Sequence, residues 1–315
     1  MPRLRVIFLL AAVALALPAT ASAADGLIAP DPAAQQITAL DGTVVWVTGA
    51  FGHQKLMQRS SDGTISAVRG APMSRNYRTV DLGRSRRNTL VLTYLRCDAG
   101  ASCKPISDDL AGHRASFKRL TLPGCTVNSG PSQWRRNIAY GLFCTGSRAN
   151  RKRSGLYLKA DGKAPLRLPR PKDAVRFGIT NIESVDLRGT RVAAVAADIY
   201  EYSFSETIAG KDLQSFFAAA SEGDSDERVR GIARQGTSSW WTLTNASHAG
   251  DPNQTRIVRA FGGGCTQSET LTSAPDAEGY LATDIAVDGA TVLLLVPGVG
   301  IVTHAPSSVL ATACP

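Results

Sequence analysis

The sequence has 315 residues, and 35 lysines and arginines against 26 aspartates and glutamates give it a formal net charge of +9. A hydrophobic fraction of 43% without any long Pro-rich or Gly/Ser-rich linker is typical of a folded globular chain and excludes an intrinsically disordered protein. After Ala23 no apolar run approaches the ~20 residues of a membrane-spanning helix, which excludes a polytopic membrane protein.

The chain begins with the pattern of a secretory signal peptide. Arg3 and Arg5 precede an apolar run from Val6 to Leu17, and the small residues from Ala21 to Ala23 supply a cleavage site. An uncleaved membrane anchor is the alternative, but a run of about a dozen residues is too short to span a bilayer. We therefore expect residues 1–23 to be removed and residues 24–315 to form a secreted or cell-surface domain.

Pairs of apolar runs joined by a short polar turn recur along this domain. The most regular pair extends from Ile182 to Ala197 around Arg188-Gly189, and Asp41-Gly42 and Asp288-Gly289 form the turns of two looser copies. Such pairs predict β-hairpins. The second runs align at six positions, 46 to 54 residues apart: Val44, Leu90, Ile138, Val192, Trp240 and Val292.

A period of this size with several strands per unit is typical of propeller blades. The first repeat supplies four candidate strands, at residues 36–40, 43–48, 54–59 and 64–68. We therefore predict an all-β single domain, a six-bladed β-propeller of four-stranded antiparallel blades. A β-sandwich of many short strands is the main alternative, but a sandwich has no reason for a six-fold period.

The arrangement of the turns resembles the secreted TolB-like β-propellers. In that family an aromatic-Ser-Pro-Asp-Gly signature follows the inner strand; here it is reduced to Leu40-Asp41-Gly42, Leu187-Arg188-Gly189 and Val287-Asp288-Gly289. The resemblance implies a propeller over most of the mature chain.

The final repeat must close the ring, because an open propeller would leave two unpaired sheet edges. It offers strands at residues 282–287, 291–296 and 301–304, with residues 308–312 as an outer strand. The short apolar run from Gly26 to Ala29 is expected to add to the same sheet.

Six cysteines in an exported chain are interpreted as disulfides. Sequence alone leaves several connectivities open. The hairpin of the third repeat favours Cys125 with Cys144, a short loop favours Cys97 with Cys103, and Cys265 and Cys314 then remain for each other. The paired Cys or Cys/His spacings of a zinc site do not occur, so we predict no metal site and no cofactor.

Loops that join the second strand of a blade to the third emerge on one face, together with the crossings between blades. The long ones are expected at residues 49–53, 97–112, 145–154, 198–210 and 245–254. Because binding residues concentrate on loops of a rigid scaffold, we expect the functional surface on this long-loop face.

Two groups of side chains on these loops are candidate ligand-binding residues. The first would bind an anionic polymer such as one at the cell surface, a phosphate surface or nucleic acid, unless it is a solvated basic loop, and comprises Arg148, Arg151, Lys152 and Arg153. The second would suit carbohydrate or protein, unless it packs against its own blade, and comprises Tyr200, Glu201, Tyr202 and Phe204. The acidic stretch from Glu222 to Glu227 is a weaker calcium candidate, since it lacks the spacing of a known calcium loop.

No catalytic motif accompanies the four scattered histidines. We therefore expect a monomeric, non-catalytic binding module of unknown ligand. Whether the protein is an enzyme stays open: an exported hydrolase or lyase could assemble its acid and base at the channel mouth from different blades. Three or more carboxylate or histidine side chains around the channel would favour the enzyme.

Overall fold

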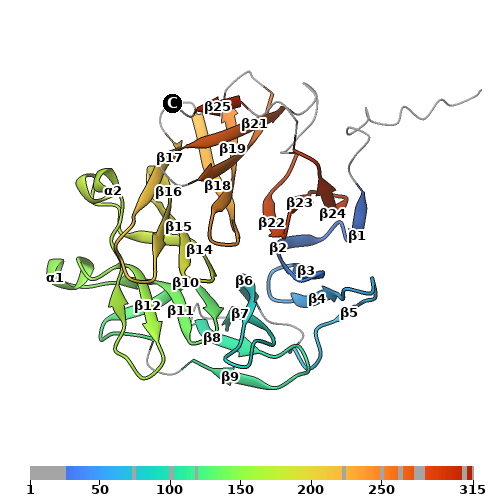
Figure 1. Cartoon of the computed structure of the whole chain (residues 1–315), viewed down its shortest axis with the longest axis horizontal. Helices are drawn as coiled ribbons and strands as arrows, with labels where there is room; N and C mark the ends of the chain where they lie inside the picture. Colours follow the sequence, from blue (N-terminus) through green and yellow to red (C-terminus); the bar gives the residue numbers. More distant parts are fainter. Residues whose placement is uncertain are drawn as a thin grey trace, which may run out of the picture.

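A computed structural model describes residues 26–72, 76–98, 103–117, 120–221, 225–248, 252–261, 265–272, 281–306 and 311–313. The predicted signal peptide at residues 1–23 lies outside these ranges. The strands form six antiparallel blades around a common centre (Figure 1). Five blades have four strands each, and blade five has β25 as a fifth; one parallel bridge between β6 and β10 joins blades two and three into an eight-stranded sheet. The prediction of an all-β, six-bladed propeller is confirmed.

The strands follow the chain from the inside of each blade to the outside. Blade one contains β2 (Ala34–Leu40), β3 (Thr43–Thr48), β4 (Lys55–Arg59) and β5 (Ile65–Ala67). Blade two contains β6 (Asn76–Arg84), β7 (Leu90–Cys97), β8 (Cys103–Asp108) and β9 (Arg114–Ser116). Blade three contains β10 (Cys125–Trp134), β11 (Asn137–Cys144), β12 (Gly155–Ala160) and β13 (Leu166–Arg167).

The other three blades follow the same plan. Blade four contains β14 (Asn181–Arg188), β15 (Arg191–Ala197), β16 (Tyr200–Thr207) and β17 (Gln214–Ala220). Blade five contains β18 (Ser225–Gln235), β19 (Ser239–His248), β20 (Gln254–Phe261), β21 (Thr266–Thr272) and β25 (Ala311–Ala313). Blade six contains β22 (Asp284–Asp288), β23 (Thr291–Val296), β24 (Gly300–His304) and β1 (Leu27–Pro30). Two short helices, α1 (Arg148–Arg151) and α2 (Lys172–Arg176), lie on connections.

The hairpins predicted from the repeated pattern form at the innermost pair of strands in each blade. All six aligned positions fall in the second strand, and Val192 pairs with Leu187 as expected. The turns need a left-handed backbone, which Gly189 (φ 61°) and Gly289 (φ 59°) adopt without a steric penalty. Val192 is fully buried in a cluster that also contains Ala139 and Leu156 of blade three, so the hydrophobic core lies between neighbouring blades.

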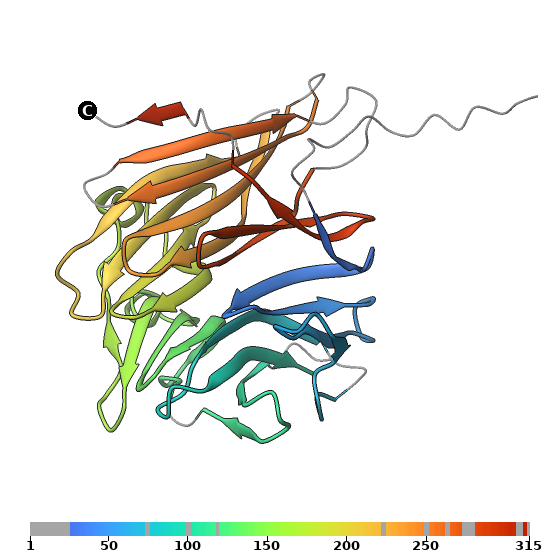
Figure 2. The ribbon, with the colours of Figure 1, turned by 45° about the vertical axis from the view of Figure 1, so that its right-hand side comes forward.

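The ring is closed by the N-terminal strand. β1 pairs antiparallel with β24, where Ala29 lies opposite Ile301 and Pro30 opposite Gly300 (Figure 2). The expectation that residues 26–29 would join the last sheet is confirmed. The expected outer strand at residues 308–312 is wrong for blade six, because β1 occupies that position; β25 instead pairs with β21 at the edge of blade five.

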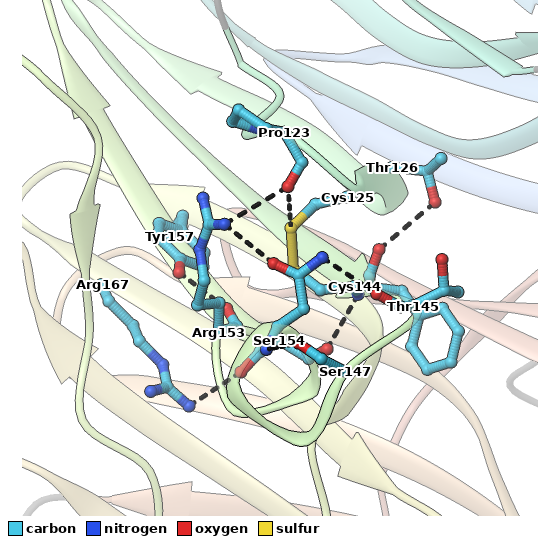
Figure 3. Close-up of a disulfide and its surroundings, with 12 residues drawn as sticks. Pro123, Cys125, Thr126, Cys144, Thr145, Ser147, Arg153, Ser154, Tyr157 and Arg167 are labelled. Carbon is cyan, nitrogen blue, oxygen red and sulfur yellow. Dashed lines mark hydrogen bonds between the residues drawn. A yellow bond between two sulfur atoms is a disulfide. The ribbon is translucent and has the colours of Figure 1, made fainter.

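Two of the three predicted disulfides lie within described residues, and both form. Cys97 and Cys103 join the facing ends of β7 and β8. Cys125 and Cys144 do the same for β10 and β11 (Figure 3). Cys314 lies outside the described residues, so its pairing with Cys265 stays a prediction.

Two of the predicted long loops are wrong. Residues 97–112 contain β8, and residues 198–210 contain β16, which leaves only short connections before these strands. In β16 five of eight residues are polar, but both faces of a blade are covered by its neighbours, so polarity does not indicate exposure here. The loops at residues 49–53 and 145–154 do separate the second and third strands of blades one and three.

Candidate functional site

A cavity of about 430 Å³ occupies the mouth of the central channel. It lies where the six inner strands begin, which is the long-loop face. Every blade contributes polar side chains to its wall. They include Gln36, Arg78, Asn128, Glu183, Arg230 and Asp284, one from each blade in chain order, and Thr79, Asn181 and Ser184 line the wall beside them. Because blades two and five are opposite in a six-membered ring, Arg78 and Arg230 face the mouth from opposite sides.

Irregularities in the inner strands set the shape of this mouth. Within the described residues, the innermost strand shifts its pairing register with the second strand in five of the six blades. Two of these shifts lie between Arg78 and Asp81 and between Val229 and Gly231. Such bulges turn side chains away from their regular direction and are frequent beside functional sites. Thr79 has φ 52°, a strained conformation for a β-branched residue, and its hydroxyl donates to the Gly130 carbonyl at 2.6 Å.

The mouth carries both signs of charge. Arg78 and Arg230 are exposed, and within the described residues neither makes an ion pair. Burial raises the pKa of Glu183, although the guanidiniums of Arg228 and Arg230 oppose the effect. Mixed charges of this kind can bind hydroxyl and carboxylate groups of a polar ligand.

Asp284 is the other carboxylate of the mouth. Its Oδ2 accepts from the Ile37 amide at 2.9 Å and its Oδ1 from the Ile285 amide at 2.8 Å. Burial nevertheless raises its pKa to about 7, against the effect of these two hydrogen bonds. The side chain is half-buried and borders the cavity, so it can present either a carboxyl or a carboxylate to a ligand near neutral pH.

A buried network closes the channel below the mouth, around a small cavity of about 40 Å³. The Arg188 guanidinium lies 3.7 Å from Asp81 and 3.3 Å from Asp186. Burial, with Asp186 nearby, raises the pKa of Asp81 to about 8 against the effect of Arg188. Four carboxylates therefore surround the channel, which reaches the number expected to favour an enzyme. Only Glu183 and Asp284 line the mouth, whereas Asp81 and Asp186 are buried beside Arg188 and hold the blades together.

A groove of about 610 Å³ adjoins the mouth and shares Asn128, Asn181 and Glu183 with it. The Asn128 side-chain amide donates a hydrogen bond to Asn181 Oδ1 at 2.6 Å, and this pair lies where the mouth meets the groove. Two apolar side chains of the groove are unusually accessible: Phe143 is 41% exposed and Ile199 is 54% exposed. The mouth and groove together form one continuous surface, on which Phe143 and Ile199 of the groove lie beside charged residues such as Asp198 and Arg228.

The aromatic and acidic candidates of blade four occupy a strand and not a loop, which corrects the sequence interpretation. Glu201, Tyr202 and Phe204 of β16 are buried. The Glu201 carboxylate accepts a hydrogen bond from the Arg228 guanidinium of blade five at 3.1 Å. Tyr200 is half-buried and packs on Phe177, with ring centroids 5.1 Å apart. Glu201 therefore connects blade four to blade five, and Tyr200 packs against the connection that carries α2.

The basic candidates lie on the predicted loop, around α1. Figure 3 shows Arg153 directed inward, where it donates to Asn150 Oδ1 at 2.9 Å and to the Pro123 carbonyl at 3.3 Å. Arg151 donates to the Gly146 carbonyl. Arg148 and Lys152 remain exposed. None of the four lines the mouth or the groove.

The calcium candidate lies partly outside the described residues, at 222–224. Within the described ranges no group of three or more His, Cys, Asp or Glu side chains could hold a metal ion. No helix in those ranges is long and apolar enough to cross a membrane.

Sequence comparison identifies no relative: no family model matches this chain, and no curated protein does. Structural comparison finds six-bladed propellers. A structure of the Aleuria aurantia lectin with α-methyl-L-fucoside aligns at 9% identity and TM-score 0.52, over 90% of this chain and 95% of that one. Another structure of the same fungal lectin, described as a six-bladed β-propeller with a fucose recognition mode, gives 10% identity, TM-score 0.50 and the same coverage.

A prolyl endopeptidase structure aligns at 11% identity and TM-score 0.44, over 83% of this chain and 38% of that one. At 9–10% identity the two lectin matches establish the propeller fold alone. The predicted TolB-like resemblance is therefore supported as an architecture, without a sequence family.

Sequence reasoning placed function on the long-loop face but missed the residues of the mouth. The six residues compared come one from each repeat. In chain order they are Gln, Arg, Asn, Glu, Arg and Asp. No common residue type marks them, and only the closure of the ring brings them together.

Proposed function

We propose that the protein is an exported, non-catalytic binding module that holds a carbohydrate in the channel mouth and the adjoining groove. The observation that carries this proposal is the continuity of the two through Asn128, Asn181 and Glu183. The predicted signal peptide and the two disulfides support an extracytoplasmic location, since disulfides persist in oxidising compartments.

The chemistry of the surface suits a sugar. Sugar rings combine a hydroxyl-bearing edge with an apolar face. Amide, carboxylate and guanidinium groups at the mouth can exchange hydrogen bonds with hydroxyls, and Phe143 offers an apolar platform in the groove. Arg78 and Arg230 favour a sugar that carries a carboxylate. The lectin that shares the fold binds a fucoside, which also supports carbohydrate as the ligand class.

Titration calorimetry with acidic and neutral oligosaccharides tests the proposal. We expect Arg78→Gln and Arg230→Gln each to weaken binding of an acidic sugar about tenfold, and Phe143→Ala to weaken neutral and acidic sugars alike. Lys211→Gln, an exposed residue on the outer part of blade four, is the charge-matched control. Binding that is absent for all sugars, or unchanged in the three variants, would contradict the proposal.

An exported hydrolase or lyase is the second candidate, favoured by the raised pKa of Asp284 in the same cavity as Glu183. A carboxyl that is protonated near neutral pH can act as a general acid. Turnover of a bound oligosaccharide that disappears in Asp284→Asn while binding persists would establish the enzyme over the binding module.

A further inference from the structure

The opposite, tight-turn face carries a second concave site. A cleft of about 520 Å³ lies between blades two and three, where the turns after β6, β10 and β12 meet. We call it the tight-turn cleft. Its charged lining comprises Arg86, Arg135, Arg136, Lys159 and Asp161. Arg87 and Lys163 are exposed beside it in sequence.

The two blades approach unusually closely at this point. A Cβ on Gly83 would clash with the Gln133 carbonyl oxygen, so only glycine permits the contact. The Arg135 amide then donates to the Arg84 carbonyl at 2.6 Å, across the blade boundary. This contact sets the Arg86-Arg87 turn of blade two beside the Arg135-Arg136 turn of blade three.

The cleft has a large excess of positive charge. Asp161 is its one acidic lining residue, and its carboxylate pairs with Arg86. Within the described residues Arg87, Arg135 and Arg136 are exposed and make no ion pair. Adjacent cations repel one another, and a guanidinium binds phosphate or sulfate through two parallel hydrogen bonds. An oxyanion ligand would relieve that repulsion.

The turn itself does not require this arginine. Arg135 has φ 56°, a left-handed conformation that glycine adopts at lower cost. The corresponding turns of blades four and six place Gly189 and Gly289 in that conformation. Strained residues that persist against the local preference concentrate at functional sites.

We infer that the tight-turn cleft binds a linear anionic polymer bearing phosphate or sulfate groups, independently of the carbohydrate proposed for the channel mouth. The cleft volume exceeds a single oxyanion, and the cations come from three turns. Successive anionic groups of one polymer can therefore occupy it together.

Binding of linear polyphosphate and of heparin oligosaccharide to the mature chain, measured across a salt series, tests the inference. A cleft variant carries Arg86→Gln, Arg87→Gln, Arg135→Gln and Arg136→Gln. A control variant of equal charge change carries Lys55→Gln, Lys104→Gln, Lys172→Gln and Lys211→Gln, which are exposed and scattered. We expect the cleft variant to bind at least tenfold more weakly with a shallower salt dependence, and the control less than threefold more weakly.

The two probes distinguish the anion, because preference for polyphosphate indicates phosphate and preference for heparin indicates sulfate. Equal losses in the cleft and control variants would show that net charge alone attracts the polymer and would overturn the inference. So would a loss confined to a variant that neutralises Arg148, Arg151, Lys152 and Arg153 of the basic loop.

A single substitution separates binding from folding. Arg135→Gly removes a cation and also the left-handed strain, so we expect a higher melting temperature together with weaker polymer binding. A lower melting temperature with unchanged binding would assign Arg135 a structural role and overturn its place in the cleft.

Discussion

At the scale of single residues, buried polar side chains of the inner strands connect neighbouring blades. Each accepts a hydrogen bond from a backbone amide of the next blade, and together they satisfy groups that the sheet pairing leaves free. The pairs are Thr38 with Leu82 at 2.9 Å, Ser132 with Leu187 at 2.7 Å, Asp186 with Arg234 at 2.7 Å and Asp284 with Ile37 at 2.9 Å.

Asp284 makes the last of these bonds sensitive to pH. Its folded pKa of about 7 exceeds that of an unfolded aspartate, so its contribution to stability is full below about pH 4 and is lost as the pH rises through about 7. Asn cannot ionise, so we expect the Asp284→Asn substitution to be more favourable to stability at about pH 8 than at about pH 5. The change that it makes in the free energy of unfolding should differ between the two pH values by about 1–2 kcal/mol.

Thermal unfolding at the two pH values measures this difference, with Asp173→Asn at an exposed position of α2 as a control. Equal shifts of melting temperature at both pH values would show that the Asp284 carboxyl does not titrate with folding in this range.

At the scale of strands, the middle of the inner hairpin of blade four is covered on both faces by neighbouring blades, so a charge introduced there is buried. Val192 of β15 is fully buried beside Leu187. We expect Val192→Asp to prevent secretion of folded protein, or to lower its stability by several kcal/mol, because the carboxylate would have no partner.

Yield of soluble protein and melting temperature check this prediction. Thr126→Asp places the same charge on an exposed strand position of β10 and should have little effect. A Val192→Asp protein with a melting temperature like that of the parent would show that the core between blades three and four tolerates the charge.

The strands also show how far sequence reasoning extends. Apolar runs beside Asp-Gly or Arg-Gly turns predicted the inner hairpins of blades one, four and six well, since the second strands of these blades are largely apolar. β16 was missed because Glu201, Ser203 and Ser205 are buried polar residues whose partners lie on blade five. The channel mouth was missed for a related reason: its members are defined by their place in the closed ring and by no local pattern.

At the scale of the whole molecule, closure of the ring depends on the approach of β1 to β24. Gly300 has φ 129°, and a Cβ there would clash with the Ala29 carbonyl oxygen. We expect Gly300→Ala to destabilise the protein by about 3 kcal/mol, because the first strand would be forced away from blade six.

Gly298→Ala is the matched control, since it lies in the same turn with φ 73° and open space around its Cβ. It should cost about 1 kcal/mol from backbone strain alone. Equal melting temperatures for the two variants would show that β1 contributes little to closure.

The predicted Cys265–Cys314 disulfide also acts on the whole molecule. Since β25 belongs to blade five, this bond would fasten the returning C-terminal segment to that blade and enclose blade six. By loop entropy it would contribute about 4 kcal/mol, against about 2 kcal/mol for Cys97–Cys103.

Replacing Cys265 and Cys314 by serine should therefore lower the melting temperature more than replacing Cys97 and Cys103. Non-reducing peptide mapping provides the direct check. A peptide in which Cys314 is free, or joined to another cysteine, would contradict the pairing.

The position of β1 has a consequence for the order of events during synthesis. The Gly26 amide donates to Thr303 Oγ1, 277 residues further along the chain. At ordinary translation rates that distance corresponds to about 15 to 60 s. Throughout this interval β1 lacks its strand partner β24, although Ala29 can already pack against Trp46 of blade one. Translation of the last blade then allows the first strand to dock, which couples completion of the ring to completion of the chain.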